Sequence, residues 1–255
     1  MPRPHPLRDA GLAFSLISVL PTGGEWPQGE RTQVAAWFPA VGVVFGLVGY
    51  GIVKLGHAVQ AEVGAPLVLG ALVVVVWALL GRLMHWDGLA DVADGYWGSG
   101  DAAQRLEIMG DSHTGAFGAT AVALVALVEV LALGAIIGHP HELPALLVPV
   151  ISRFSATAAA WLGTPARPGG LGRSVMGHPS TLGMLIGTVP LAGAFIGLWI
   201  GFNLAGLALG AFALCVAFAI PHVLAQRFGG VTGDVMGASV LLTEAIFFAA
   251  FALVR

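Results

Sequence analysis

The sequence predicts an all-α protein: a polytopic integral membrane helical bundle of about seven transmembrane helices, preceded by a short N-terminal interfacial helix. The first observation is composition, because 57% of the residues are hydrophobic and only 10% are charged, whereas soluble domains carry roughly 25% charged residues. The second is that the apolar residues lie in runs of about 20, the length that crosses a bilayer. We see no strong internal repeat and no low-complexity linker, so we expect one integral membrane domain, residues 1–255.

Seven segments are long and apolar enough to span a membrane. They are residues 34–56, 66–85, 115–138, 144–162, 182–202, 204–224 and 238–254. The segment 10–20 is too short to span, and we expect it to lie at the interface or to pack into the bundle. The N-terminus lacks a convincing small-residue cleavage site, so no removed signal peptide is expected.

Seven spans place the positive residues unequally on the two sides of the membrane. One side receives Arg3, Arg8, Arg31, Arg82, Arg105, Arg167, Arg173 and Arg227, and the other only Lys54 and Arg255. Positive loops favour the cytoplasm, so the first side is predicted to be cytoplasmic. The long polar loops 86–114, 163–181 and 225–237 lie on that same side.

Charge and cysteine content exclude some partners and crosslinks. The net charge of −3 gives no support for a nucleic-acid partner. The single cysteine, Cys215, cannot form an intrachain disulfide. The expected partner is the lipid bilayer, and the sequence leaves a homo-oligomer open.

The stretch "HWDGLADVADGYWG" places three aspartates at i, i+4 and i+7: Asp87, Asp91 and Asp94. On a helix this spacing puts them on one face. Unpaired carboxylates repel one another and resist dehydration near a membrane, so a cation should offset that cost. The alternatives are a solvated acidic loop at a helix end, or a path for a transported cation.

A second acidic stretch follows in "RLEIMGDSHTG", where Glu107 and Asp111 are expected one turn apart on a second short helix. Two such helices facing each other would form an oxygen-rich cage for one or two Mg²⁺ ions. The candidate metal ligands are Asp87, Asp91, Asp94 and Glu107. The flanking His85 and His113 are weak candidates, since imidazole suits softer metals.

Three further regions offer groups that could contact a substrate. In "FGGVTGDVMG", glycines allow close backbone approach, and Thr232 and Asp234 could contact a sugar, a phosphate or a metal; the alternative is a plain turn. Arg153 lies within a span, where it could bind phosphate or pair with Glu129 or Glu244. Arg167 and Arg173, in the loop 163–181, could meet a diphosphate or could simply mark the cytoplasmic side.

These residues carry a resemblance to a known family. "HWDGLADVADG" followed by "RLEIMGDSHTGAFG" resembles the signature of the cobalamin synthases, the adenosylcobinamide-GDP ribazoletransferases. "SLISVLP", "WFPAVGVVFGLVG", "ISR" at 151–153, "GGLG" at 169–172 and "GGVTGDVMGA" at 229–238 follow in the expected order. One departure is Trp86, where leucine is expected.

The resemblance implies a membrane phosphotransferase of the bacterial cytoplasmic (inner) membrane, with its active site facing the cytoplasm. It would join GDP-activated adenosylcobinamide to α-ribazole or its 5′-phosphate and release GMP, in the last assembly stage of vitamin B12. The catalytic residues are then expected to be Asp91, Asp94 and Asp111. The substrate-binding residues would be Arg153, Arg167, Arg173, Thr232 and Asp234.

A looser likeness to the CDP-alcohol phosphotransferases is the first alternative. Asp91-x-x-Asp94-Gly95 fits the first half of their pattern, and Glu107-x-x-x-Asp111 fits the second with glutamate for aspartate. By analogy with the last acid of that pattern, Asp111 is the expected general base. The alanine-arginine pair after the first half is missing, so a phospholipid synthase fits less well. A cation transporter would need a continued polar track across the bundle.

Overall fold

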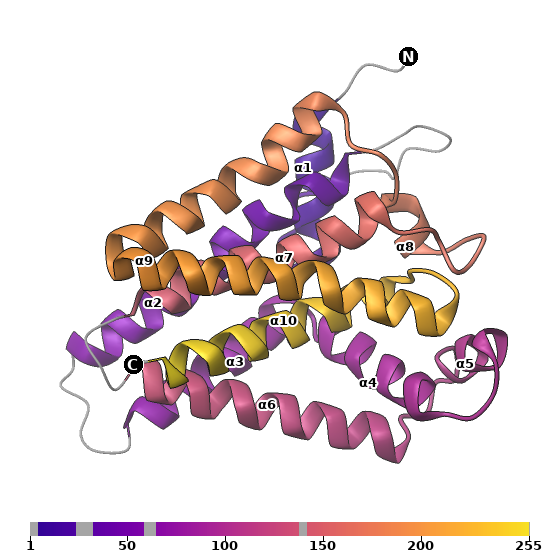
Figure 1. The fold of residues 1–255 in the computed structure, drawn as a ribbon, viewed down its shortest axis with the longest axis horizontal. Coiled ribbons are helices and arrows are strands. Elements are labelled where there is room, and N and C mark those ends of the chain that lie inside the picture. Colours follow the sequence, from indigo (N-terminus) through magenta and orange to yellow (C-terminus); the bar gives the residue numbers. More distant parts are fainter. Residues whose placement is uncertain (1–4, 24–32, 59–64, 138–141, 255) are drawn as a thin grey trace.

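The computed structural model describes residues 5–23, 33–58, 65–137 and 142–254. Within these ranges the chain forms helices and no strand (Figure 1), which confirms the all-α prediction. The elements are α1 (Pro6–Ile17), the 3₁₀ helix η1 (Val34–Trp37), α2 (Phe38–Ala58), α3 (Ala65–Leu80), α4 (Met84–Trp97), α5 (Ala102–Ile108), α6 (Ala116–Ile137), α7 (Leu143–Leu162), α8 (Leu171–Val175), α9 (Thr181–Phe228) and α10 (Gly233–Leu253).

Several helices are long and apolar enough to cross a membrane. Within the described residues there are five, namely η1 with α2, α6, α7, α9 and α10, or six if α3 and α4 together form one bent span. The predicted count of seven is therefore not confirmed, although a multi-pass membrane protein is supported.

Helix α9 contains two of the predicted spans, 182–202 and 204–224. A straight helix of its 48 residues would be about 72 Å long, more than twice the roughly 30 Å of hydrocarbon in a bilayer. The backbone leaves helical geometry at Asn203 (φ 53°, ψ −136°), and the two arms fold back on each other there (Figure 1). The predicted break between the two spans thus coincides with the turn.

The predicted span 66–85 is wrong at its end. Helix α3 stops at Leu80, and α4 begins at Met84 at an angle of 91° to it. Between them Arg82 (φ 53°) and Leu83 (φ 59°) adopt the left-handed conformation, which non-glycine residues rarely take. The Arg82 guanidinium donates two hydrogen bonds to backbone carbonyls at the end of α1, which holds the bend. The acidic helix therefore does not continue α3 but packs along α10 and α6.

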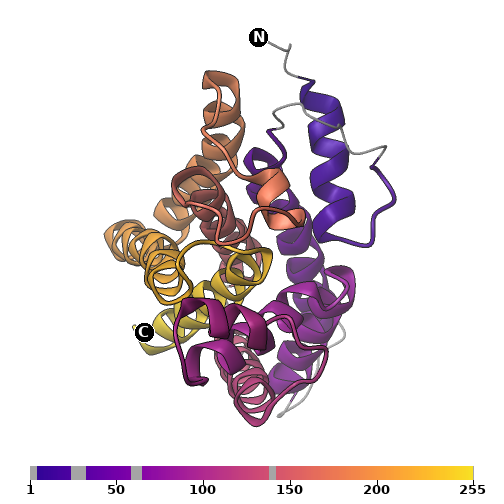
Figure 2. The ribbon, with the colours of Figure 1, turned by 90° about the vertical axis from the view of Figure 1, so that its right-hand side faces the viewer.

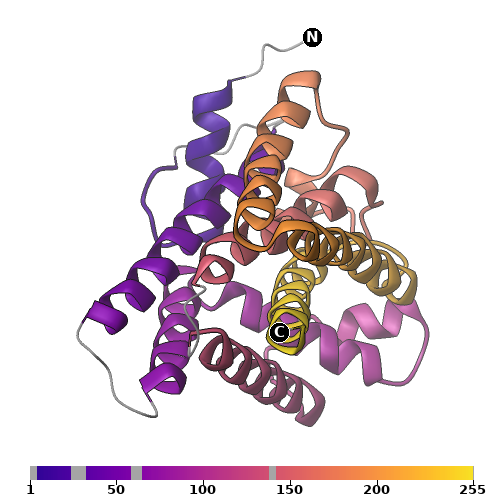
Figure 3. The ribbon, with the colours of Figure 1, turned by 60° about the vertical axis from the view of Figure 1, so that its left-hand side comes forward.

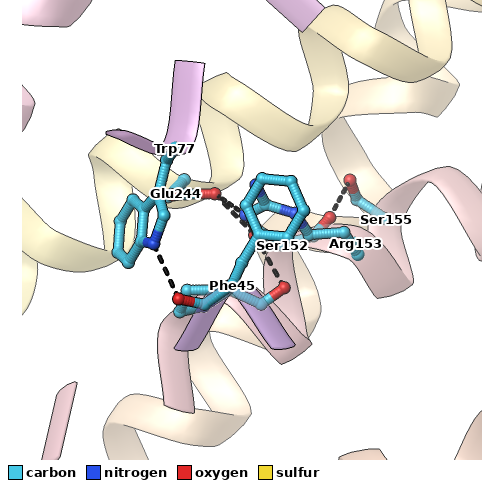
Figure 4. Close-up of polar contacts among 7 residues, drawn as sticks. Phe45, Trp77, Ser152, Arg153, Ser155 and Glu244 are labelled. Atoms are coloured by element: carbon cyan, nitrogen blue, oxygen red, sulfur yellow. Dashed lines mark hydrogen bonds and ion pairs between the residues drawn. The ribbon is translucent and has the colours of Figure 1, made fainter. Parts of the chain in front are cut away.

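Helices α7 and α10 form the buried centre of the bundle. Arg153 of α7 forms an ion pair with Glu244 of α10, and both side chains are 2% exposed. The Ser152 hydroxyl donates to the same carboxylate at 2.8 Å. The guanidinium lies 4.3 Å from the ring centroid of Phe45 in α2, and the Trp77 indole of α3 donates to the Phe45 carbonyl (Figure 4). Four helices therefore meet around one buried charge pair.

The polar segments gather at one end of the bundle. Helices α4, α5 and α8 and the turn between α9 and α10 lie at the right of Figure 1 and face the viewer in Figure 2. The C-terminus and the turn of α9 lie at the opposite end, which comes forward in Figure 3. The predicted gathering of the loops 86–114, 163–181 and 225–237 is confirmed. The third loop is shorter than predicted, since only residues 229–232 lie between the two helices. Arg3, Arg31 and Arg255 lie outside the described residues.

We predict that breaking the buried ion pair destabilises the bundle. Arg153→Met leaves Glu244 without its cation beside Glu129, which lines the same small cavity, and losing one partner of a buried pair typically costs about 3–5 kcal/mol. Thermal unfolding in detergent measures the change. The double variant Arg153→Met/Glu244→Met is the control, because removing both charges should recover part of the loss. Equal stability of Arg153→Met and the wild type would contradict this role.

Candidate functional site

Helix α4 carries the three aspartates as the spacing predicts. Asp87, Asp91 and Asp94 all lie within Met84–Trp97; Asp87 is exposed, and the other two are half-buried. Asp234, in the first turn of α10, is near enough for its charge to act on Asp91. We call these four residues the acidic cluster. The sequence singled out Asp234, but not its place beside the aspartates of α4.

Glycine allows α4 to approach α10 closely enough to form this cluster. A Cβ atom on Gly88 would lie 2.9 Å from the Asp234 Cα and 3.0 Å from its carbonyl oxygen. A second contact lies about one turn earlier on α4, at His85. There a Cβ on Gly237 of α10 would lie 3.2 Å from the His85 Cα. The two backbones therefore touch at both points, which brings Asp234 to the acidic face of α4.

Asp94 has a structural task that the sequence did not reveal. Its two carboxylate oxygens accept hydrogen bonds from the backbone N–H groups of Gly115 (2.7 Å) and Gly118 (2.9 Å). These groups lie at the start of α6, where backbone donors lack partners within the helix. Asp94 thereby caps α6 from a different helix and ties α4 to it.

The segment before α10 is ordered by its own side chains. The Thr232 hydroxyl accepts from the Val235 N–H at 3.1 Å and caps the helix. The same hydroxyl donates to a carboxylate oxygen of Asp234 at 3.3 Å. The alternative of a plain turn is therefore not sufficient, because the Thr232 side chain also orients the Asp234 carboxylate of the acidic cluster.

A short parallel bridge holds the loop after α7 against this segment. The Ala166 N–H donates to the Val231 carbonyl (3.0 Å), and the Val231 N–H donates to the Thr164 carbonyl (2.7 Å). Gly230 (φ 155°) permits the contact, because a Cβ there would lie 2.7 Å from the Thr164 oxygen. The bridge places Arg167, the residue after Ala166, next to the acidic cluster.

The three arginines predicted to meet substrate occupy different surroundings. Arg167 donates to the Leu106 carbonyl of α5 at 2.6 Å, and its charge acts on Asp91. Arg173 is exposed on α8. Arg153 is paired with Glu244 beneath the site, which is one of the two partners that the sequence analysis offered. Of these three arginines, Arg167 is therefore the one whose charge acts on the acidic cluster.

The prediction that Glu107 and Asp111 share a second helix is wrong. Helix α5 ends at Ile108, and tight turns follow, with the Gly110 N–H donating to the Glu107 carbonyl and the Asp111 N–H to that of Ile108. Asp111 is exposed and accepts hydrogen bonds from the ring (2.7 Å) and backbone N–H of His113. These hydrogen bonds lower the pKa of the Asp111 carboxyl. Glu107 is also exposed.

The cluster carries more negative charge than its neighbours offset. Burial and, after it, the charges of Asp234, Asp87 and Asp94 together raise the pKa of Asp91 to about 6, against the lowering effect of Arg167. The structure gives no hydrogen bond or ion pair to the side chains of Asp87 and Asp91 within its described ranges. A bound cation would relieve this repulsion.

The donor set suits Mg²⁺ only if the substrate supplies further oxygens. In the described part of the chain, no three His, Cys, Asp or Glu side chains gather closely enough to hold a metal ion, so Asp87, Asp91, Asp94 and Glu107 do not form a complete cage. Mg²⁺ commonly takes one or two protein carboxylates and completes its shell with water and substrate phosphates. The unpaired carboxylates of α4 fit that requirement, and the ligand assignment stays a prediction.

Comparison with known proteins shows the family to which this chain belongs. The cobalamin-5-phosphate synthase family matches residues 9–252. An adenosylcobinamide-GDP ribazoletransferase of Syntrophobacter fumaroxidans is 38% identical, covering 88% of each chain. One from Pseudomonas aeruginosa is 37% identical, covering 97% of this chain and 98% of its own. One from Corynebacterium efficiens is 35% identical over 92% and 87%. No solved structure matches.

We predict that Gly88→Ala lowers both stability and turnover, because its methyl group would separate α4 from Asp234. Overpacking of this kind costs about 1–3 kcal/mol. The matched control is Gly193→Ala in α9, where a Cβ would have no neighbour within 4 Å, so this variant should behave as the wild type. Thermal unfolding and product formation in detergent are the measurements. If both variants behave alike, the close contact does not position the cluster.

Proposed function

Because this chain belongs to the cobalamin-5-phosphate synthase family, we propose that its acidic cluster is the active site of an adenosylcobinamide-GDP ribazoletransferase. The enzyme joins GDP-activated adenosylcobinamide to α-ribazole, or to its 5′-phosphate, and releases GMP. We assign the active site to the acidic cluster because four aspartates from α4 and α10 gather at the polar end of an apolar bundle. The ribazoletransferase names of the relatives do not favour a CDP-alcohol phosphotransferase or a transporter.

The reaction exchanges one phosphorus–oxygen bond for another. A ribose hydroxyl oxygen of α-ribazole bonds to the phosphorus next to the corrinoid arm. The bond from that phosphorus to the bridging oxygen of the diphosphate breaks, and GMP leaves with this oxygen. The hydroxyl proton passes to a base. Such a transfer depends on in-line positioning and charge neutralisation more than on covalent help from the protein.

Asp87, Asp91, Asp94 and Glu107 are the residues that we propose to hold one or two Mg²⁺ ions. A cation held by these side chains would supply neutralisation of the negative charge of the diphosphate. Asp94 also keeps α4 in place through the N-terminus of α6, so its role is in part structural. Glu107 contributes only if α5 lies against the bound substrate, because its side chain is exposed.

Substrate contacts are proposed for the groups around the cluster. Arg167 binds the diphosphate, since it is held beside Asp91 by the Leu106 carbonyl, and Arg173 extends the positive surface on α8. Thr232 and Asp234 contact the ribose or a phosphate from the start of α10. Arg153 is proposed to contact the substrate from the buried side of the site. Asp111 is proposed as the general base, and its hydrogen bond to His113 gives the proton a route onward.

We predict that Asp91→Asn removes most of the activity without unfolding the protein. The amide loses an anionic oxygen, and losing electrostatic stabilisation of this kind typically costs about 10²–10³-fold in turnover. GMP release from GDP-activated cobinamide and α-ribazole, by purified protein with Mg²⁺, is the measurement, and chelation should abolish it. The matched control is Asp101→Asn, which changes an exposed N-cap outside the cluster and should retain activity.

Asp94→Asn distinguishes the positioning role from metal binding alone. It places an amide opposite the N–H donors of α6, so it should lower the unfolding temperature as well as the rate. Full GMP release by Asp91→Asn, or release that needs no divalent ion, would refute the proposed site.

The acidic cluster is proposed to face the cytoplasm from the bacterial inner membrane, since Arg105, Arg167, Arg173 and Arg227 lie in or next to the segments at that end of the bundle and positive residues favour the cytoplasm. Single cysteines in a Cys215→Ala background test the orientation. An impermeant maleimide applied to intact cells should leave Gln104→Cys and Pro168→Cys unlabelled. It should label Leu204→Cys, next to the turn of α9. The reverse pattern would overturn the orientation.

A further inference from the structure

A cavity of about 230 Å³ opens beside the acidic cluster. Helices α1, α2, α4, α7, α8 and α10 all contribute to its walls. Asp87 and Asp234 line it at its more exposed side, while Arg153 and His85, which are 2% and 7% exposed, line its buried side. The cavity thus leads from the proposed reaction site into the interior of the bundle.

The walls between these polar groups are apolar. They include Leu16, Ile17, Phe38, Val175, Met236 and Val240. A charged nucleotide would lose its hydration in such surroundings without replacement. An aromatic ring would instead gain from leaving water, since burial of apolar surface is favourable.

We propose that this cavity binds the base of α-ribazole and thereby selects the acceptor substrate, an inference that rests on the proposed function. The base is dimethylbenzimidazole, which is planar, bicyclic and largely apolar. An apolar protein cavity of about 150 Å³ accepts benzene, so about 230 Å³ has room for a second, fused ring. The corrinoid macrocycle is too large for this cavity, and the GDP group is too strongly charged for it.

The position of the cavity suits the chemistry of the acceptor. With the base inside, the ribose attached to it lies at the opening between Asp87 and Asp234. A ribose hydroxyl then faces the place where the diphosphate meets the acidic cluster. The same arrangement leaves the corrinoid and the guanosine outside the bundle, where there is space for them.

Arg153 supplies a polar contact at the buried side. Its Nη1 atom binds Glu244 and Ser152, whereas its Nε atom is buried and has no hydrogen-bond partner within the described residues. A buried donor without an acceptor is unfavourable. The free ring nitrogen of a benzimidazole is an acceptor, and a bond between the two would satisfy both groups.

The experiment narrows the cavity with Ala156→Leu, a buried wall residue of α7. Steady-state GMP release is measured against two acceptors, α-ribazole and the riboside of unsubstituted benzimidazole. Because small differences in the size of an apolar group change selectivity by about 10–200-fold, kcat/KM should shift at least about tenfold toward the smaller acceptor. The KM for GDP-activated cobinamide should stay within about twofold of the wild-type value.

The matched control is Ala225→Leu, in a second cavity of about 250 Å³ that has no carboxylate among its lining residues. It adds the same group to a space of similar size, so the ratio between the two acceptors should not change. If Ala156→Leu does not fold, Met236→Ala enlarges the same cavity. That variant should relax the preference and accept a base with a third fused ring.

An unchanged acceptor ratio in both cavity variants would overturn the proposal, and so would a rise in KM for the corrinoid substrate alone. If a lipid chain occupied the cavity instead of the base, the acceptor ratio would stay unchanged, because the acceptor would not contact the altered wall. Wild-type protein that releases no GMP with either acceptor would contradict the proposed function instead. The two failures are therefore distinguishable.

Discussion

The buried ion pair between Arg153 of α7 and Glu244 of α10 is the constraint on which the rest of the structure depends. Two charges removed from water are stable only in close contact with each other and with further hydrogen bonds, here from Ser152. This requirement leaves few ways to align α7 with α10. Because α10 begins with Thr232 and Asp234, the register set by the ion pair also determines where the site can form.

The acidic helix α4 is positioned by its neighbours rather than by its own preferences. Gly88 lets it touch α10 at Asp234, and Asp94 fastens it to the first turn of α6. Four carboxylates in one place repel one another, and burial together with this repulsion raises the pKa of Asp91. The packing of the bundle therefore maintains an arrangement that is unfavourable until cationic groups or a metal ion are bound. Phosphoryl transfer requires positive charge beside the phosphate oxygens, and under the proposed function a cation held by these carboxylates would supply it.

The acidic cluster lies at the polar end of the bundle, and one cavity connects it to the apolar interior. Under the proposed function, the charged substrate groups would meet the aspartates at the polar end of the bundle. The cavity that continues past Asp87 toward Arg153 is where we propose that the apolar base of the acceptor binds. Taken together, the two proposals would have the protein bind two chemically different substrates from the same side, one at its surface and one in its core.

The sequence by itself determined the helical class, the gathering of polar segments at one end, the break of α9 near Asn203 and the shared face of Asp87 and Asp91. These follow from local periodicity, run length and turn-forming residues, which act within a few residues. Only the tertiary structure decided the right-angle bend after α3, the exclusion of Asp111 from α5 and the capping role of Asp94. The bend depends on left-handed backbone at Arg82 and Leu83, and the capping depends on a contact between α4 and α6. At the end of α5, the Leu106 carbonyl accepts from the distant Arg167, while the Gly110 N–H bonds to Glu107 instead. None of these leaves a periodic signal in the sequence.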